Sequence, residues 1–213
     1  MPARTQAERR TATTTDLIET ARRLFGRDGY AATSIDSIAH ASGMTKGAVY
    51  HHFAGKTDLF RAVFISQEQR LARMIASAST QTADPWDRVR LGCHAFLRAC
   101  LDPQVRQIVL LDGPAALGWE TVRAIEYEHT LKLLRNGLAA AAAEDRIAPG
   151  DVTIRAHLLF GALCEAGTLI ARAEDPTALL PAVLDETDEL LAALTREVPS
   201  LPPPAAGTDN RAT

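Results

Sequence analysis

The 213-residue chain is poor in cysteine and in long apolar runs, and each shortage excludes a class of protein. Its three cysteines (Cys93, Cys100 and Cys164) form no Cys-x-x-Cys pair and are too few for a disulfide framework, so we expect buried thiols. The longest apolar run, residues 138–143, is far shorter than the ~20 residues of a membrane-spanning helix. Because the first residues also lack the apolar segment of a secretion signal, the sequence predicts a cytoplasmic protein without a membrane segment.

The sequence also lacks the patterns of a sheet, of a nucleotide-binding loop and of a catalytic or metal site. No stretch alternates apolar and polar residues over the length of a strand, which predicts an all-α fold. No Ser/His/Asp or Cys/His arrangement stands out, and His94, His129 and His157 do not have the spacing of metal ligands. We therefore expect neither a metal nor another cofactor. An all-α enzyme is the weaker of the functional hypotheses, because no catalytic arrangement is apparent.

Charge is unevenly distributed along the chain, whose net charge is -3. Residues 1–56 carry eight basic and five acidic side chains, a net charge of +3, whereas the remainder carries 15 basic and 21 acidic ones, a net charge of -6. A basic N-terminal part attached to an acidic body favours a polyanion as the partner of the N-terminal part alone.

The N-terminal quarter contains the start and stop signals of short helices. Residues 1–12 are polar, contain arginine and show no periodicity, so we expect a flexible arm. Apolar residues at helical spacing follow from Thr13, and Gly29 has the position of a C-terminal cap. A short helix then opens at residues 33–36, and a third runs from Lys46 to about residue 53.

The rest of the chain predicts six longer helices, which brings the total to about nine. Their approximate ranges are 56–79, 85–100, 103–111, 119–143, 151–173 and 176–196, separated by segments rich in Asp, Pro and Gly. Residues 199–213 are rich in Pro and Ala and predict a disordered tail. The expected division of the chain is therefore residues 1–55 with the arm and the short helices, residues 56–198 with the longer helices, and this tail.

Two short helices joined by a tight turn, with a preceding helix that braces them, form the helix-turn-helix plan. Gly43 can adopt the positive φ that the turn needs, and Met44 and Val49 are expected to pack the pair onto the first helix. The third helix then exposes small and polar residues, namely Thr45, Lys46, Gly47, Ala48, Tyr50, His51 and His52.

These exposed residues suit the major groove of DNA. Gly47 and Ala48 let the backbone approach bases, and Lys46 can donate to a guanine edge or to a phosphate. The hydroxyl of Tyr50 and the imidazoles of the two following histidines can donate to phosphate oxygens. Thr33 and Lys56 stand at the starts of neighbouring helices, where anions are favoured. The alternative is that Tyr50 and the histidines merely cover a small hydrophobic bundle.

The stretch from about residue 13 to 64 resembles the TetR family of transcriptional regulators. The similar residues include Ala21-Arg22-Arg23-Leu24-Phe25, Gly29-Tyr30, Thr33-Ser34-Ile35, Ile38-Ala39, the run from Ala41 to Phe53, and Lys56-Thr57-Asp58-Leu59-Phe60. The resemblance implies a homodimer, one recognition helix per subunit, a palindromic double-stranded operator and a C-terminal effector domain. It also implies that Thr45, Lys46, Gly47 and Ala48 face bases, and that Thr33, Tyr50, His51, His52 and Lys56 contact phosphates.

The larger C-terminal part offers residues for an apolar effector cavity, although each is also compatible with plain core packing. Residues 109–119 are similar to one recurring variety of TetR sensor domain, and a mostly apolar cavity with a few polar groups suits a hydrophobic or aromatic small molecule. The candidate effector-binding residues are Phe96, Leu97, Cys100, Leu110, Trp119, Tyr127, Leu131, His157, Phe160, Gly161 and Cys164.

The last two predicted helices, within residues 151–196, carry the small and apolar residues of a helical interface. They predict a homodimer through a four-helix contact, the alternative being packing within one chain. Together these features predict an effector-gated repressor, for which a ligand-independent DNA-binding factor is the alternative. The sequence leaves the operator, the effector and the direction of its effect open.

Overall fold

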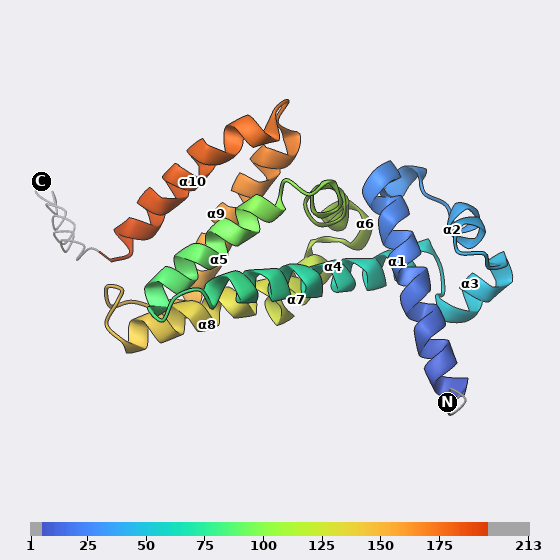
Figure 1. Cartoon of the computed structure of the whole chain (residues 1–213), viewed down its shortest axis with the longest axis horizontal. Coiled ribbons are helices and arrows are strands. Elements are labelled where there is room, and N and C mark those ends of the chain that lie inside the picture. The colour runs from blue at the N-terminus through green and yellow to red at the C-terminus, as the bar shows by residue number, and fades with distance from the viewer. Residues whose placement is uncertain (1–5, 196–213) are drawn as a thin grey trace, which may run out of the picture.

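The computed structural model describes residues 6–195, with side chains from residue 11 onward. Over this range the chain is helical and contains no strand, as the all-α prediction requires. Figure 1 shows an elongated molecule with α1, α2 and α3 at one end and the longer helices at the other. The predicted disordered tail and the first residues of the arm lie outside the described residues.

Three helices form the N-terminal end, which we call the head (residues 6–55). They are α1 (Gln6–Ala32), α2 (Ile35–Ala41) and α3 (Lys46–His52). The backbone of α1 leaves the helical region at Gly29 (φ 80°, ψ 164°), where the sequence predicts a cap, but a further turn continues α1 to Ala32. The helix begins at Gln6 rather than Thr13, because the residues before Thr13 include good helix formers such as Ala and Glu, so helix formation there does not depend on an apolar stripe.

The turn of the head has the geometry that the sequence predicts. Gly43 adopts φ 67°, and nothing lies within 4 Å of the place where a Cβ would stand. Ser34 begins α2 with a reciprocal capping box to Ser37, and Thr45 begins α3 by accepting the Ala48 N–H. Val49 is fully buried, so that face of α3 is turned inward and its polar face outward.

Two long helices, α4 (Lys56–Ser79) and α5 (Pro85–Ala99), lead from the head into the larger part of the molecule. The chain then forms a π-helix, η1 (Val105–Asp112), and continues directly into α6 (Gly113–Leu117). The break expected directly after the predicted helix 103–111 is therefore wrong, because Gly113 is helical (φ -49°, ψ -60°) and the break lies at Gly118 (φ 79°).

Four more helices complete the body (residues 56–195): α7 (Trp119–Glu128), α8 (Thr130–Ala143), α9 (Val152–Arg172) and α10 (Pro176–Ala193). The single helix predicted over 119–143 is interrupted at His129, whose backbone is not helical (φ -123°, ψ -91°). No glycine or proline marks this break. Within the described residues α9 alone is long and apolar enough to cross a membrane, and in the fold it packs against η1, α8 and α10.

The buried residues fall into two clusters that do not follow the expected boundary between residues 55 and 56. One cluster joins the head to the first half of α4, to η1 and to α7, and the other joins the second half of α4 to α5, α8, α9 and α10. Asp112 at the end of η1 accepts the Tyr30 N–H (2.6 Å) and is held by Gln107 (2.9 Å). The head is therefore packed on the body through η1 as well as continued into it by α4.

Candidate nucleic-acid interface and effector cavity

The outward face of α3 presents the predicted base-facing residues to solvent. Thr45, Lys46 and Gly47 are exposed, and Ala48 is half-buried. The Thr45 hydroxyl oxygen accepts the Ala48 N–H (3.2 Å), which orients this hydroxyl at the start of the helix. Lys46 Nζ lies 3.0 Å from Asp36 Oδ2 of α2, and this carboxylate raises the pKa of the lysine.

Tyr50 and His51 are exposed residues of the same helix, the tyrosine with 49% of its surface accessible. His52 is half-buried, and its Nδ1 lies 3.0 Å from the Thr14 hydroxyl of α1. Tyr50 and His51 are thus exposed to solvent, whereas His52 is held against α1.

Two predicted phosphate contacts are engaged within the head instead. Thr33 is only 2% exposed, and its hydroxyl donates to the Gly29 carbonyl (2.8 Å). Lys56 Nζ donates to the Tyr30 carbonyl (2.8 Å) and lies 4.2 Å from the centre of the Tyr30 ring. Both side chains stabilise the end of α1, and we leave the Thr33 hydroxyl out of the proposed DNA contacts.

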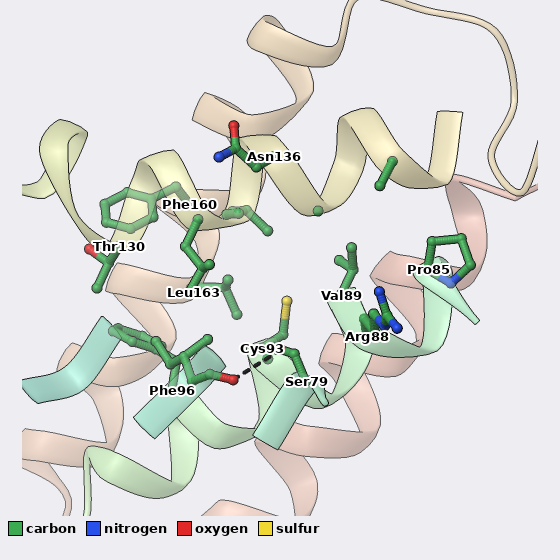
Figure 2. Close-up of a pocket in the computed structure, with 16 residues that line it drawn as sticks. Ser79, Pro85, Arg88, Val89, Cys93, Phe96, Thr130, Asn136, Phe160 and Leu163 are labelled. Carbon is green, nitrogen blue, oxygen red and sulfur yellow. Dashed lines mark hydrogen bonds between the residues drawn. The ribbon is translucent and has the colours of Figure 1, made fainter. Parts of the chain in front are cut away.

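A cavity of about 270 Å³ lies in the body between α4, α5, α8 and α9 (Figure 2). Its walls are mostly apolar, and Figure 2 shows Phe96, Phe160 and Thr130 at one end and Arg88 with Pro85 at the other. The polar lining residues are Ser79, Arg88, Thr130 and Asn136. Such a space suits a small, largely apolar molecule.

Two candidate effector residues, Phe96 and Phe160, line this cavity, and the others do not. Trp119 (60% exposed), Tyr127 (39% exposed), His157 and Gly161 lie at the surface, because α7 and α9 turn those positions outward. The others are buried or half-buried outside the cavity wall: Leu97, Cys100, Leu110, Leu131 and Cys164.

Sequence reasoning missed most of the cavity wall, including Cys93, Val89, Leu133 and Leu134. Their apolar spacing is that of any core helix, so nothing in the sequence distinguishes a wall from a packed interior. Burial raises the pKa of the Cys93 thiol to about 12, so this cysteine is a thiol in the wall and not a thiolate nucleophile.

Two buried carboxyl groups lie behind the Thr130 end of the cavity, and the sequence analysis did not predict them. Glu68 of α4 is 1% exposed and accepts a hydrogen bond from the Thr130 hydroxyl (2.7 Å). Glu126 of α7 is also buried, and Arg123 lies 3.3 Å from it. Burial raises the pKa of Glu68 to about 8 and that of Glu126 to about 7.

A helix-turn-helix head joined to a helical body with an apolar cavity defines the class of two-part helical regulators. Residues 17–63 match the family model of bacterial regulatory proteins of the tetR family, and residues 86–194 match that of the tetracyclin repressor-like C-terminal domain. The chain therefore belongs to the TetR family of transcriptional regulators, and its relatives are regulators rather than enzymes.

Individual relatives agree with this assignment. A crystal structure of a TetR-family transcriptional regulator from Pectobacterium atrosepticum superposes with a TM-score of 0.78 and 31% identity, over 91% of this chain and 99% of that one. The transposon Tn10 TetC protein of Escherichia coli is 28% identical over 73% of this chain and 79% of its own length. The regulator TtgR of Pseudomonas putida is 37% identical, but the match covers only 45% of this chain and 47% of TtgR.

Proposed function

We propose that this regulator is a repressor that binds a palindromic operator as a homodimer and is released by a small, largely apolar effector. The observation that carries the proposal is the exposed face of α3, where Lys46, Gly47, Tyr50 and His51 point to solvent while Val49 anchors the helix. Small and hydrogen-bonding side chains at the N-terminal end of such a helix suit the major groove.

The outer faces of α9 and α10 support the homodimer. Large apolar side chains there remain accessible in the single chain: Ile154 (59%), Leu158 (70%), Leu169 (55%) and Leu190 (57%). A groove between the two helices continues this surface. Clustered exposed apolar residues of this kind mark an interaction surface, and a second copy of the same helices fits it by symmetry.

The apolar cavity supports the proposal of a small-molecule effector, and α4 connects the cavity to the head. Ile75 and Ser79 of α4 line the cavity, whereas Lys56 begins the same helix beside the head. A ligand that shifts α4 would change the spacing of the two recognition helices, which must stand about 34–36 Å apart to enter successive major grooves. The coupling is reciprocal, so operator DNA would weaken effector binding by the same factor.

The test is a selection of genomic fragments by the purified protein, followed by affinity measurements on the enriched sequence. We expect one palindrome to be enriched, and Lys46→Ala to change the preferred bases. Tyr50→Phe should weaken binding about tenfold for every sequence, since one hydrogen bond to a charged phosphate is lost. Tyr127→Phe in the body is the matched control. Absence of any enriched sequence, or equal effects of Tyr50→Phe and Tyr127→Phe, would contradict the proposal.

A further inference from the structure

A second hollow, distinct from the effector cavity, opens between α4 and α5. Figure 1 shows α5 rising away from α4 towards its C-terminal end. Side chains of the two helices and of residues 102 and 105 line a cleft of about 690 Å³ there. Leu71, Ala99 and Val105 give it a buried apolar floor. It shares no lining residue with the cavity between α4, α5, α8 and α9.

The rim of this cleft is positively charged. Arg70 and Arg73 come from α4 and Arg98 from α5, against a single acidic rim residue, Asp102. Asp102 Oδ1 accepts the Gln104 N–H (2.8 Å), so one oxygen of this carboxylate is engaged, and three arginines still outnumber it at the rim. The body as a whole is acidic, so this concentration of guanidinium groups is a local feature and not the background charge of the domain.

The arginines are largely unused within the described part of the chain. Arg70 has a distant ion pair with Glu19 (3.8 Å), whereas Arg73 and Arg98 make no hydrogen bond or ion pair there. Guanidinium groups bind carboxylates and phosphates through paired, charge-assisted hydrogen bonds. The guanidinium groups of Arg73 and Arg98, one from each helix, are therefore available to bind an anion.

The cleft also contains a buried polar group that lacks a partner. Gln67 is only 4% exposed, and its Oε1 atom is buried without a hydrogen bond. A buried acceptor without a donor costs roughly 1–3 kcal/mol, so such atoms usually mark a missing partner. Because this oxygen is closed to solvent, a ligand donor in the cleft would satisfy it once the Gln67 side chain turns towards the cleft.

We infer that the cleft between α4 and α5 binds a small organic anion, a carboxylate or a phosphate ester, that also carries a hydroxyl or amino donor. The anionic group lies between Arg73 and Arg98, the Gln67 side chain turns so that its Oε1 accepts the donor, and the apolar part covers Leu71 and Ala99. The inference does not depend on DNA binding or on the effector cavity, and its test involves neither.

The experiment is calorimetry on the full-length protein at about 0.15 M salt, where long-range charge attraction is screened. The probes are 3-hydroxybenzoate and glycerol 3-phosphate, with benzoate and the neutral 3-hydroxybenzyl alcohol and glycerol as comparisons. We expect at least one of the two hydroxylated anions to bind, with a Kd at least about tenfold below that of its neutral analogue. The responding anion distinguishes a carboxylate from a phosphate ligand.

Variants locate the binding site. Arg73→Gln combined with Arg98→Gln should raise the Kd at least about tenfold, because two charge-assisted contacts are lost. The control is Arg61→Gln with Arg172→Gln, an equal change in charge at exposed positions outside the cleft, and it should leave the Kd unchanged. Gln67→Leu should weaken the binding of 3-hydroxybenzoate to that of benzoate.

Three results would overturn the inference. The first is that neither hydroxylated anion binds the wild-type protein. The second is that the control pair weakens binding as much as the cleft pair. The third is that binding survives the cleft substitutions but is lost in Phe160→Leu, which would place the anion in the effector cavity. Because the substituted arginines are exposed, thermal melting should confirm that these variants fold.

Discussion

Glu68 is the residue whose environment differs most from what its place in the sequence suggests. In the run Gln67-Glu68-Gln69-Arg70 it has the appearance of a solvated helix face, yet it is buried between α4 and α8. Only the packing of α7 and α8, which the local sequence does not contain, removes this carboxyl group from water. Glu126 stands close enough to raise its pKa further.

This burial makes the stability of the protein dependent on pH. The carboxyl group of Glu68 has a pKa of about 8 in the folded chain and an ordinary value of 4.5 when unfolded. Between these values the folded state holds a proton that the unfolded state has released, so the free energy of unfolding falls as the pH rises. Glu68→Gln should remove most of this pH dependence. Near pH 8 it should raise the free energy of unfolding by on the order of a few kcal/mol.

Urea unfolding at pH 5, 6.5 and 8 measures this effect, with Glu120→Gln on the exposed surface of α7 as the control. Glu126 of α7, beside Arg123, also has a pKa raised by burial, to about 7, and keeps a smaller slope in the variant. Parallel pH profiles for the wild type and Glu68→Gln would show that the carboxyl group is not buried as described.

Asp36 is a second residue whose role follows from one contact. It forms an exposed ion pair with Lys46, so a carboxylate stands beside the face that we assign to DNA. Asp36→Asn removes a repulsion with phosphate and frees the lysine, and the affinity for DNA should rise about three- to tenfold. Stability should change by less than about 0.5 kcal/mol, since exposed pairs contribute little.

Titration of a labelled duplex with Asp36→Asn and with Asp145→Asn, an exposed acidic residue of the body, separates this local effect from a general change in charge. Equal or weaker binding by Asp36→Asn than by the wild type would count against the assigned docking face.

At the scale of elements, the start and end of a helix are best predicted where a single residue has a specific backbone role, such as a capping aspartate or a glycine with positive φ. Asp84, Asp151 and Asp175 cap α5, α9 and α10, and Gly43 forms the turn of the head. The π-helix was not predictable, because its hydrogen-bond pattern results from packing between α1, α4 and α9. For the same reason Asp112-Gly113-Pro114 resembles a break while the chain there stays helical.

Gly113 is the tightest point of this junction. A Cβ there would stand 2.6 Å from Phe64 Cε2 and 3.2 Å from the Ile108 carbonyl oxygen. Gly113→Ala should therefore destabilise the protein by about 1–3 kcal/mol through overpacking, despite the better helix propensity of alanine.

The matched variant is Gly43→Ala, which meets nothing within 4 Å but must adopt φ 67°. It should cost about 1 kcal/mol from the backbone alone and leave the junction between head and body unchanged. Thermal melting compares the two variants, and amide hydrogen exchange shows whether the added exchange lies in η1 and α4 or in α2 and α3. A Gly113→Ala protein as stable as the wild type would mean that the start of α6 is not packed against α4 as described.

At the scale of the whole molecule, the sequence identifies the head far better than it identifies the cavity. The head is predicted from many residues at fixed spacing. The cavity is a space between helices that arises only from how they pack. Phe96 and Phe160 were found because aromatic residues are enriched in such walls, while Thr130 was missed since its neighbourhood reads as an uninterrupted helix.

The exposed apolar face of α9 and α10 gives the prediction for assembly. Leu158, 70% exposed, should lie inside the interface of two copies. Leu158→Arg should therefore convert the protein to a monomer in sedimentation experiments without lowering the stability of the single chain. Met74→Arg, at an exposed apolar residue of α4, is the control and should leave the dimer intact.

The most direct test of the account compares the affinity of the protein for a selected palindrome with its affinity for one half-site in a duplex of equal length. If two copies of α3 bind together, the palindrome should bind at least about a hundredfold more tightly, and Leu158→Arg should lose this advantage. Equal affinities for the two duplexes, or an advantage that survives in the monomeric variant, would contradict the central claim that a dimer presents paired recognition helices.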